Sequence, residues 1–350
     1  MTAIVHNRDA TVDILRGFAI AVMIGVHVYE YLFYNPYAIS LFSFYYPHIA
    51  YLFLFITGAM VALSAFKKNR TFSHYLKRGV AILLMAVFLD VAVYQIQPFI
   101  TFDILYVIGF SMPLAFLFLY LPRFIQLSLV LFIFLATPIF YGMFGYPTET
   151  SLLLIEKSGF QDIGLIGVLK NAFFTGWFPL FPWLGFVLLG AIFGDLRWRC
   201  KHFLCQSNRA LLFLGMLLMA VGSVPLYFAF LKGSGFTLFP GILGYVGFVV
   251  FATGFSATLF SIVQHTWRTF VGYQPFAWLG KVALLTYIGH LALLEVISFY
   301  VWRELGALQT VVGYTLLVAT FVLLAYAVYR MKIQIDWKRK HWALHFLFGD

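Results

Sequence analysis

Residues 13–33 read DILRGFAIAVMIGVHVYEYLF, a nearly unbroken apolar run with charged residues close to its two ends. At about 1.5 Å per residue, a helix of this length crosses the roughly 30 Å hydrocarbon core of a bilayer. The run is too long for the apolar core of a secretory signal peptide, and Asp13 and Arg16 flank its start. The stretch therefore predicts a membrane-spanning first helix that is not cleaved.

The same apolar character extends along the whole chain. Of its 350 residues, 63% are hydrophobic and 10% are charged, whereas a soluble domain carries roughly 25% charged residues. This composition excludes a soluble globular protein and a disordered one. Apolar runs of about 18–25 residues also exclude an outer-membrane barrel, whose strands alternate over about ten residues. Cys200 and Cys205 lie in a basic stretch without zinc-ligand spacing, so we expect free thiols.

Ten apolar segments predict an all-α fold, a polytopic integral membrane helical bundle. These segments cover residues 13–34, 48–66, 79–97, 100–121, 124–144, 177–195, 210–231, 238–264, 276–301 and 308–330. No linker indicates a second soluble domain. We therefore expect one membrane domain over 1–350, with a core at 8–330 and a basic cytosolic tail at 331–350. The long loop 145–176 is expected to be functional or to carry short helices.

The distribution of Lys and Arg predicts the orientation. Sorted by loop, 17 of these cations fall on one side and 4 on the other. Because cytoplasmic loops carry the excess of Lys and Arg, both termini are expected in the cytosol. The net charge of +10 arises from these short loops, so it does not indicate nucleic-acid binding. The small size favours the cytoplasmic (inner) membrane of a prokaryote.

The first helix carries a polar stripe. Asp13, Arg16, His27 and Glu30 recur at helical spacing on one face. Ionisable residues inside spanning helices are rare and by default mark functional sites. The alternative is structural: Arg16 pairs with Asp13, and His27 is satisfied within the bundle.

Further polar side chains are expected at a similar depth in other helices, namely Asp90, Asp103, His48, His290 and Glu295. A histidine beside a carboxylate suits general-base catalysis, because the imidazole titrates near neutral pH and the carboxylate fixes its tautomer. The same set suits a proton relay equally well. A metal site is not expected, because no two of the three histidines share a helix at ligand spacing.

The loop KKNRTFSHYLKR, residues 67–78, is strongly basic. It either fixes topology only or binds phosphates, for which arginine offers forked hydrogen bonds. Arg78 opens the third segment, and Arg16 opens the first segment at the same predicted membrane face. No phosphate-binding loop of the Walker or GxGxxG type is present. In residues 178–194, two prolines are expected to bend the helix entry, where Trp183 lines a cavity.

Several short motifs, taken in order, resemble the transmembrane acyltransferase superfamily, which includes the acyltransferase-3 enzymes and the heparan-α-glucosaminide N-acetyltransferase-like proteins. The opening VDILRGFA at residues 12–19, followed by His27, resembles the family's start. The other similar stretches are FLFITG at 53–58, KRG at 77–79, ILYVIG at 104–109, FPLFPWLGFVLLG at 178–190, LGK at 279–281 and YIGH at 287–290.

The resemblance implies an enzyme that takes an acyl group, expected to be acetyl, from cytosolic acetyl-CoA or another acyl-CoA. The acceptor is a glycan or another small molecule on the far side of the lipid bilayer. Arg16 and Arg78 match donor-site residues, with Lys77 and Asp13 beside them, and His27 matches a catalytic histidine. The human glucosaminide-type enzyme has asparagine at the position of His27, so His48 is a second candidate for the base. In place of the Arg-x-x-Arg pair of the acyltransferase-3 branch, this chain has Tyr75 before Arg78.

We therefore expect a membrane acyltransferase in which His27, oriented by Asp103 or Asp90, deprotonates the acceptor. Transfer is direct or passes through an acyl-histidine. The acceptor side is expected to include His290, Glu30, Asp90, Trp183 and Glu295. The main alternative is a proton-coupled transporter using the same polar column, although the chain lacks the repeated halves of many transporters. A structural membrane protein is a third interpretation, and a homodimer is left open.

Overall fold

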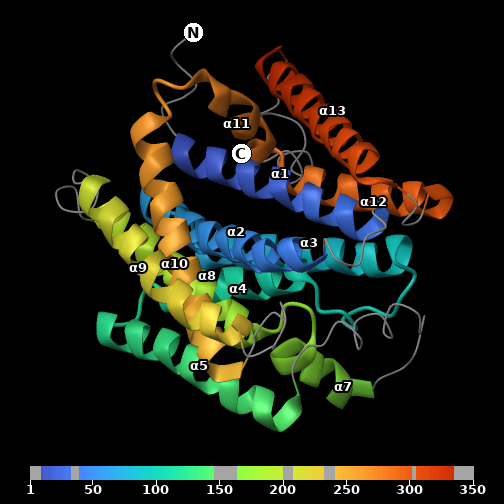
Figure 1. The fold of residues 1–350 in the computed structure, drawn as a ribbon. Coiled ribbons are helices and arrows are strands. Elements are labelled where there is room, and N and C mark those ends of the chain that lie inside the picture. The colour runs from blue at the N-terminus through green and yellow to red at the C-terminus, as the bar shows by residue number, and fades with distance from the viewer. Residues whose placement is uncertain are drawn as a thin grey trace. The chain divides into compact units, whose positions relative to one another are not determined.

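The computed structural model describes residues 9–32, 39–145, 164–199, 208–231, 241–301 and 305–334, and these residues form helices and short connections without a β-strand (Figure 1). The α-helices are α1 (Ala10–Leu32), α2 (Ile39–Lys68), α3 (Phe72–Phe88), α4 (Ile104–Phe118), α5 (Arg123–Phe144), α7 (Gly164–Lys170), α8 (Leu180–Arg199), α9 (Asn208–Leu231), α10 (Gly241–Thr266), α11 (Gln274–Lys281), α12 (Ala283–Val301) and α13 (Ala307–Gln334). Two π-helices, η2 (Leu89–Val93) and η3 (Asn171–Thr175), follow α3 and α7, and a short 3-10 helix, η4 (Val271–Tyr273), precedes α11.

Eight helices in the described part of the chain are long and apolar enough to cross a membrane. They are Ala10–Leu32, Ile49–Lys68, Arg123–Phe144, Leu180–Arg199, Arg209–Phe228, Gly244–Thr266, Ala283–Val301 and Ala307–Met331. Each overlaps one of the ten predicted segments. The all-α, integral membrane fold is thus confirmed, while the cytosolic placement of the termini stays a prediction.

The other two predicted segments, 79–97 and 100–121, differ from the observed helices. The third helix begins earlier, at Phe72, and changes to a π-helix at Leu89, while the fourth runs only over Ile104–Phe118. The cause is polar: the buried Asp90 carboxylate accepts a hydrogen bond from the backbone N–H of Phe99, which folds the connection back. Asp103 then caps the next helix by accepting from the Ile104 N–H at 2.6 Å.

The predicted segment 276–301 is also divided. α11 ends at Lys281, and Val282 has non-helical dihedral angles, φ −117° and ψ 30°. Its N–H bonds the carbonyl of Leu279 at 3.1 Å, which closes a tight turn before α12. α11 is therefore a short helix of its own rather than the start of a spanning helix.

The chain forms two compact units by internal packing. The first comprises Met1–Ile49 with Ala257–Asp350, and the second comprises Ala50–Ser256. The prediction of a single domain therefore stays a prediction. In the first unit, α1 lies beside α11, α12 and α13 (Figure 1). Two glycines permit the approach of α1 to α11: a Cβ on Gly17 would overlap the Phe276 carbonyl oxygen, and one on Gly280 would overlap that of Asp13.

In the second unit, glycines again bring helix backbones together. A Cβ on Gly58 of α2 would overlap the Val187 carbonyl of α8, and one on Gly190 of α8 would overlap the Phe55 carbonyl of α2. Towards the start of α8, Phe181 departs from helical dihedrals, as the two prolines of this stretch predict.

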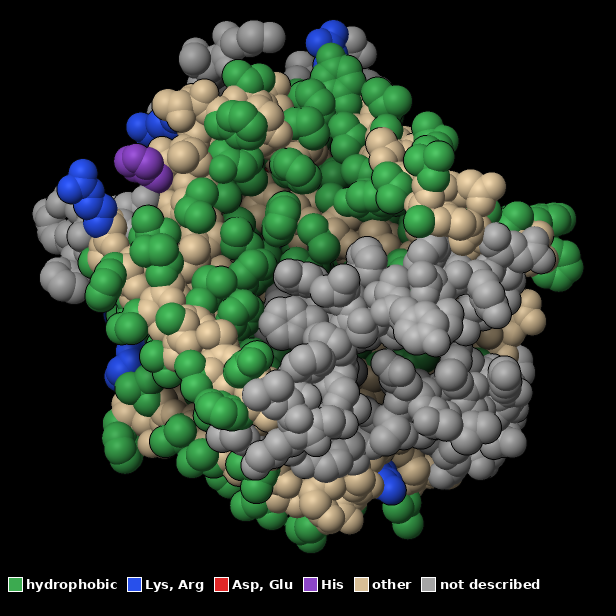
Figure 2. Space-filling view, viewed as in Figure 1, with side chains coloured by type: hydrophobic (Ala, Val, Ile, Leu, Met, Phe, Trp, Pro, Cys, Tyr) green, Lys and Arg blue, Asp and Glu red, His purple; other side chains and the backbone are tan. Residues whose placement is uncertain are grey.

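The described part of the structure has many hydrophobic side chains on its surface, as expected for helices that face lipid. Hydrophobic side chains cover most of the described face in Figure 2. Single residues such as Phe299 (85% exposed) and Phe124 (79% exposed) would be costly in water. A membrane-embedded helix keeps them in hydrocarbon, so these exposures fit a spanning bundle.

Candidate functional site

Two histidines from distant parts of the sequence meet in the first unit. His27 Nδ1 of α1 lies 2.8 Å from His290 Nε2 of α12, at hydrogen-bonding distance. The two rings are stacked, with centroids 5.1 Å apart and planes inclined by 14°. His290 is fully buried, whereas His27 is half-buried. The structure thus brings together two of the predicted site residues, and His27 is the member closer to the surface.

The hydrogen bonds assign the protons on both rings. His290 Nδ1 lies 2.8 Å from the carbonyl oxygen of Thr286, and a carbonyl can only accept. His290 Nδ1 therefore carries a proton, and in a neutral imidazole its Nε2 is then an acceptor. It follows that the Nδ1–H of His27 donates to His290, which leaves the lone pair on Nε2 of His27.

The neutral state of this pair follows from its surroundings. Among the described residues, the ion pairs found involve neither histidine. His290 packs edge-on against Tyr287 and Phe321, with centroids at 5.6 and 6.5 Å. Burying an uncompensated charge in such surroundings is costly. A neutral pair, in which Nε2 of His27 keeps a lone pair that can accept a proton, is the chemical state that the geometry favours.

Glu295 belongs to a neighbouring contact rather than to this pair. Its side chain hydrogen-bonds Tyr31 of α1, four residues beyond His27. Glu30 is exposed on α1. His48 lies in α2, but its side chain is outside the described part of the structure.

Asp13 and Arg16 lie at the start of α1 and contact each other. Arg16 Nη1 is 3.6 Å from Asp13 Oδ1, and the same nitrogen donates to the carbonyl of Gly280 at 3.1 Å. This carbonyl belongs to the last turn of α11, where helix carbonyls have no intrahelical partner. Arg16 thus joins α1 to the end of α11, which matches the structural alternative for this pair.

The carboxylates Asp90 and Asp103 lie in the second unit, among Tyr106 and the backbone of residues 99–104. Asp90 Oδ2 accepts from the Tyr106 hydroxyl at 2.5 Å and from the Phe99 N–H at 3.1 Å. Thr101 Oγ1 donates to Asp90 Oδ1 at 3.4 Å. Both carboxylates are buried, and each organises the backbone around it. Because His27 belongs to the first unit, the prediction that one of them orients His27 stays untested.

The basic segment between α2 and α3 is also in the second unit. Lys77 is exposed and Arg78 is half-buried, in the first turns of α3. Burial lowers the pKa of the nearby His74, and the positive charges of Arg70, Arg78 and Lys68 lower it further. His74 is therefore neutral at pH 7 and adds no charge to this segment.

Trp183 is completely buried in α8 and packs among Phe178, Phe186 and Phe248 at centroid distances of 4.9–6.3 Å. These contacts place it in an aromatic core, whereas the sequence suggested that it lines a cavity.

A polar cluster that the sequence analysis missed lies at the ends of α5 and α8. We call Arg123, Gln126, Asp195 and Arg199 the Asp195 cluster. Asp195 is buried, and its carboxylate pairs with both arginines. The four-residue spacing from Asp195 to Arg199 was the available sequence signal. No comparable signal links Arg123 to Asp195, which lie 72 positions apart in the sequence.

The fold and its buried polar groups define a polytopic helical membrane protein with an intramembrane histidine pair. A family model described as heparan-alpha-glucosaminide N-acetyltransferase, catalytic, matches residues 8–232. The chain belongs to this family of membrane acetyltransferases, which confirms the resemblance over these residues. The match includes His27 and Arg78 but ends before His290. None of the curated proteins compared with the chain matches it.

Proposed function

We propose that the protein transfers an acetyl group from acetyl-CoA to an amine or hydroxyl of a glycan or similar small acceptor. The observation that carries this proposal is the His27–His290 hydrogen bond, taken with the family match. A membrane acetyltransferase needs a group that accepts a proton from the acceptor, and Nε2 of His27 is suited to that role.

In the direct reaction, His27 Nε2 removes a proton from the acceptor as its nitrogen or oxygen bonds to the acetyl carbonyl carbon. The carbon–sulfur bond of acetyl-CoA then breaks, and the departing thiolate takes up the proton. If an acyl-histidine forms instead, Nε2 attacks the acetyl carbonyl carbon and the carbon–sulfur bond breaks to release the CoA thiolate. The acceptor then displaces the acetyl group from Nε2 in a second step, and its proton passes to the thiolate. His290 acts on either route by holding the His27 ring and keeping its proton on Nδ1.

The donor phosphates require a cationic site. We assign it to Arg78 and Lys77 in the second unit, because they lie in the first turns of α3 and the forked hydrogen bonds of an arginine suit a phosphate. Arg16, with Asp13, is proposed to support the donor side through α11 rather than as a flexible phosphate ligand, since its guanidinium already holds the Gly280 carbonyl. The Lys and Arg distribution supports a cytosolic donor and an acceptor on the far side of the membrane. The small size of the chain supports a prokaryotic inner membrane. Glu30 and Glu295 are proposed to lie towards the acceptor.

The test combines donor binding with transfer by the purified full-length protein. Calorimetry measures binding of acetyl-CoA, with free CoA for comparison, and a chromatographic assay follows acetylation of glucosamine. His27→Ala is expected to lower transfer by at least about 100-fold, the usual contribution of a general base, with donor affinity within several-fold. Arg78→Ala is expected to weaken donor binding instead.

Two exposed positions provide matched controls. His265→Ala removes a histidine at the end of α10, and Arg209→Ala removes an arginine at the start of α9. Both variants should bind donor and transfer acetyl as the wild type does. Undiminished acetyl transfer by His27→Ala would show that His27 is neither the general base nor the nucleophile. Absence of acetyl-CoA binding to folded wild-type protein at millimolar concentration would reject the donor and favour a transporter.

A further inference from the structure

The Asp195 cluster holds two arginines in fixed positions around one buried carboxylate. Arg123 Nη2 donates to Asp195 Oδ2, and Arg199 Nε donates to Asp195 Oδ1 at 2.5 Å. The Asp195 side chain is only 2% exposed, whereas those of Arg123 and Arg199 are 38% and 59% exposed. The carboxylate therefore anchors the two guanidinium groups from inside while both remain accessible from outside.

Neighbouring contacts restrict the arginines further. Arg123 Nη1 donates to Gln126 Oε1 at 2.6 Å, and the guanidinium of Arg199 lies 4.9 Å from the centre of the Phe66 ring. Gln126 is itself buried and donates to the carbonyls of Phe118 and Leu121, both at 3.0 Å. Such contacts reduce the entropy that two arginines lose on binding an anion.

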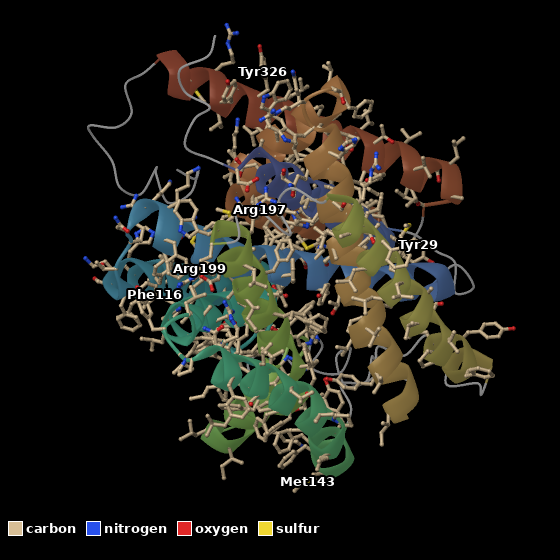
Figure 3. All side chains as sticks on the ribbon, turned by 90° about the vertical axis from the view of Figure 1, so that its left-hand side faces the viewer. Tyr29, Phe116, Met143, Arg197, Arg199 and Tyr326 are labelled. Atoms are coloured by element: carbon tan, nitrogen blue, oxygen red, sulfur yellow. The ribbon has the colours of Figure 1, made fainter. Side chains whose placement is uncertain are left out.

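The cluster lies at a membrane boundary. Arg123 is the first residue of one candidate span and Arg199 is the last residue of another. These two helices, α5 and α8, pack together. Figure 3 places Arg199 and Arg197 at one end of α8, while Met143 marks the opposite end of α5. The cluster lies at a membrane boundary whichever side of the membrane the start of α5 and the end of α8 face.

Apolar side chains border the cluster on the outside. Tyr120 is 66% exposed, Phe124 is 79% exposed, and Trp198 is 41% exposed. Tyrosine and tryptophan at this position are typical interface residues, and a phenylalanine one position beyond Arg123 faces the lipid chains. A cationic site with hydrocarbon immediately beside it fits a ligand that has a charged head and an apolar tail.

The surrounding helix ends add positive charge. α2 runs parallel to α8, and α3 begins directly after α2, so the end of α2, the start of α3 and the end of α8 lie on the same side. These ends and the connection between α2 and α3 carry Lys67, Lys68, Arg70, Lys77, Arg78 and Arg197. Within the described residues of these ends and of α5, Asp195 is the one carboxylate. The local potential therefore favours anions even though Asp195 neutralises one arginine.

We propose that the Asp195 cluster is a binding site for the phosphate headgroup of an anionic phospholipid, with Arg123 and Arg199 as the phosphate ligands. The lipid chains lie against the exposed apolar surface around Phe124. A soluble phosphate compound would gain nothing from that surface, which is why the observations favour a lipid. This site does not depend on the proposed acetyl transfer.

The experiment reconstitutes the full-length protein in nanodiscs with equal amounts of phosphatidylglycerol and phosphatidylcholine. Native mass spectrometry then counts each lipid that remains bound. The wild type is expected to retain mostly phosphatidylglycerol. Arg199→Gln is expected to lower this enrichment about fivefold, the effect of one cation at an anionic membrane surface. The control is Arg209→Gln, which removes one positive charge from an exposed position at the start of α9. This variant should leave the phosphatidylglycerol enrichment unchanged.

Asp195→Asn separates a built site from attraction by net charge alone. This variant raises the net charge by one, so simple attraction predicts more bound phosphatidylglycerol. The proposal predicts less, because both arginines lose their anchor. If Asp195→Asn does not fold, Arg199→Gln and its control decide the question. Equal retention of both lipids by the wild type would overturn the proposal, as would displacement of the bound lipid by saturating acetyl-CoA.

Discussion

At the scale of single residues, the position of one proton determines what the histidine pair can do. The Thr286 carbonyl fixes the proton on His290, and His290 in turn fixes the one on His27. A backbone carbonyl thus performs the orienting role that a carboxylate performs in many acid–base sites. His290 is a positioning residue in this scheme, since it acts through His27.

The positioning role predicts different effects for two substitutions of His290. Glutamine places an acceptor oxygen near the original Nε2, so His290→Gln should keep much of the activity. His290→Leu leaves the Nδ1–H of His27 unsatisfied, and kcat should fall about 5- to 150-fold, equivalent to about 1–3 kcal/mol. KM for acetyl-CoA should stay within about twofold in both variants, because neither substitution replaces a proposed phosphate ligand.

Steady-state kinetics on both variants, with thermal unfolding as a check on folding, provides the measurement. A purely structural role would lower the unfolding temperature and the amount of active enzyme without separating glutamine from leucine. Equal kcat values for the two variants would therefore contradict the positioning role.

The sequence could identify His27 and His290 as candidates, because polar residues are conspicuous in apolar helices. It could not show that the two meet, since 263 positions separate them and helix periodicity carries no information about tertiary partners. The acidic groups illustrate the same limit: the sequence could not show that Asp90 holds the backbone of Phe99 or that Asp195 binds Arg123.

At the scale of helices, the contact between α1 and α11 sets a strict steric condition. Gly17→Ala places a methyl group against the Phe276 carbonyl, so the two helices must separate. Overpacking of this kind costs about 1–3 kcal/mol. The control is Gly313→Ala in α13, where an added Cβ has no neighbour within 4 Å; it should be neutral or stabilise by about 0.5–1 kcal/mol.

Thermal unfolding of the two variants in detergent tests this prediction. Gly17→Ala should unfold at a lower temperature than the wild type, and Gly313→Ala should not. Equal unfolding temperatures for Gly17→Ala and Gly313→Ala would show that the backbones of α1 and α11 do not pack as closely as described.

The spanning helices themselves were predictable, because an apolar run of the required length has few alternatives in water or lipid. Helix ends set by single polar groups were less predictable. The break at Val282 and the fold-back around Asp90 interrupt runs that remain apolar in sequence.

At the scale of the whole molecule, the Lys and Arg distribution predicts that Arg70 faces the cytosol and Lys170 faces the opposite side. Cysteine labelling checks this in a background with Cys200→Ser and Cys205→Ser. In intact cells, a membrane-impermeant maleimide should label Lys170→Cys but not Arg70→Cys until the cells are opened. The reverse pattern would invert the orientation, and with it the proposed sides of donor and acceptor.

The packing of α1 against α11, α12 and α13 has a consequence for how the protein is made. The ribosome adds roughly 5–20 residues per second, so α1 is complete roughly 10–50 s before α11 emerges. During that interval, Arg16 and His27 lack the Gly280 carbonyl and the His290 ring that later satisfy them. α1 must therefore wait for α11 and α12, and the histidine pair forms only after α12 has been synthesised.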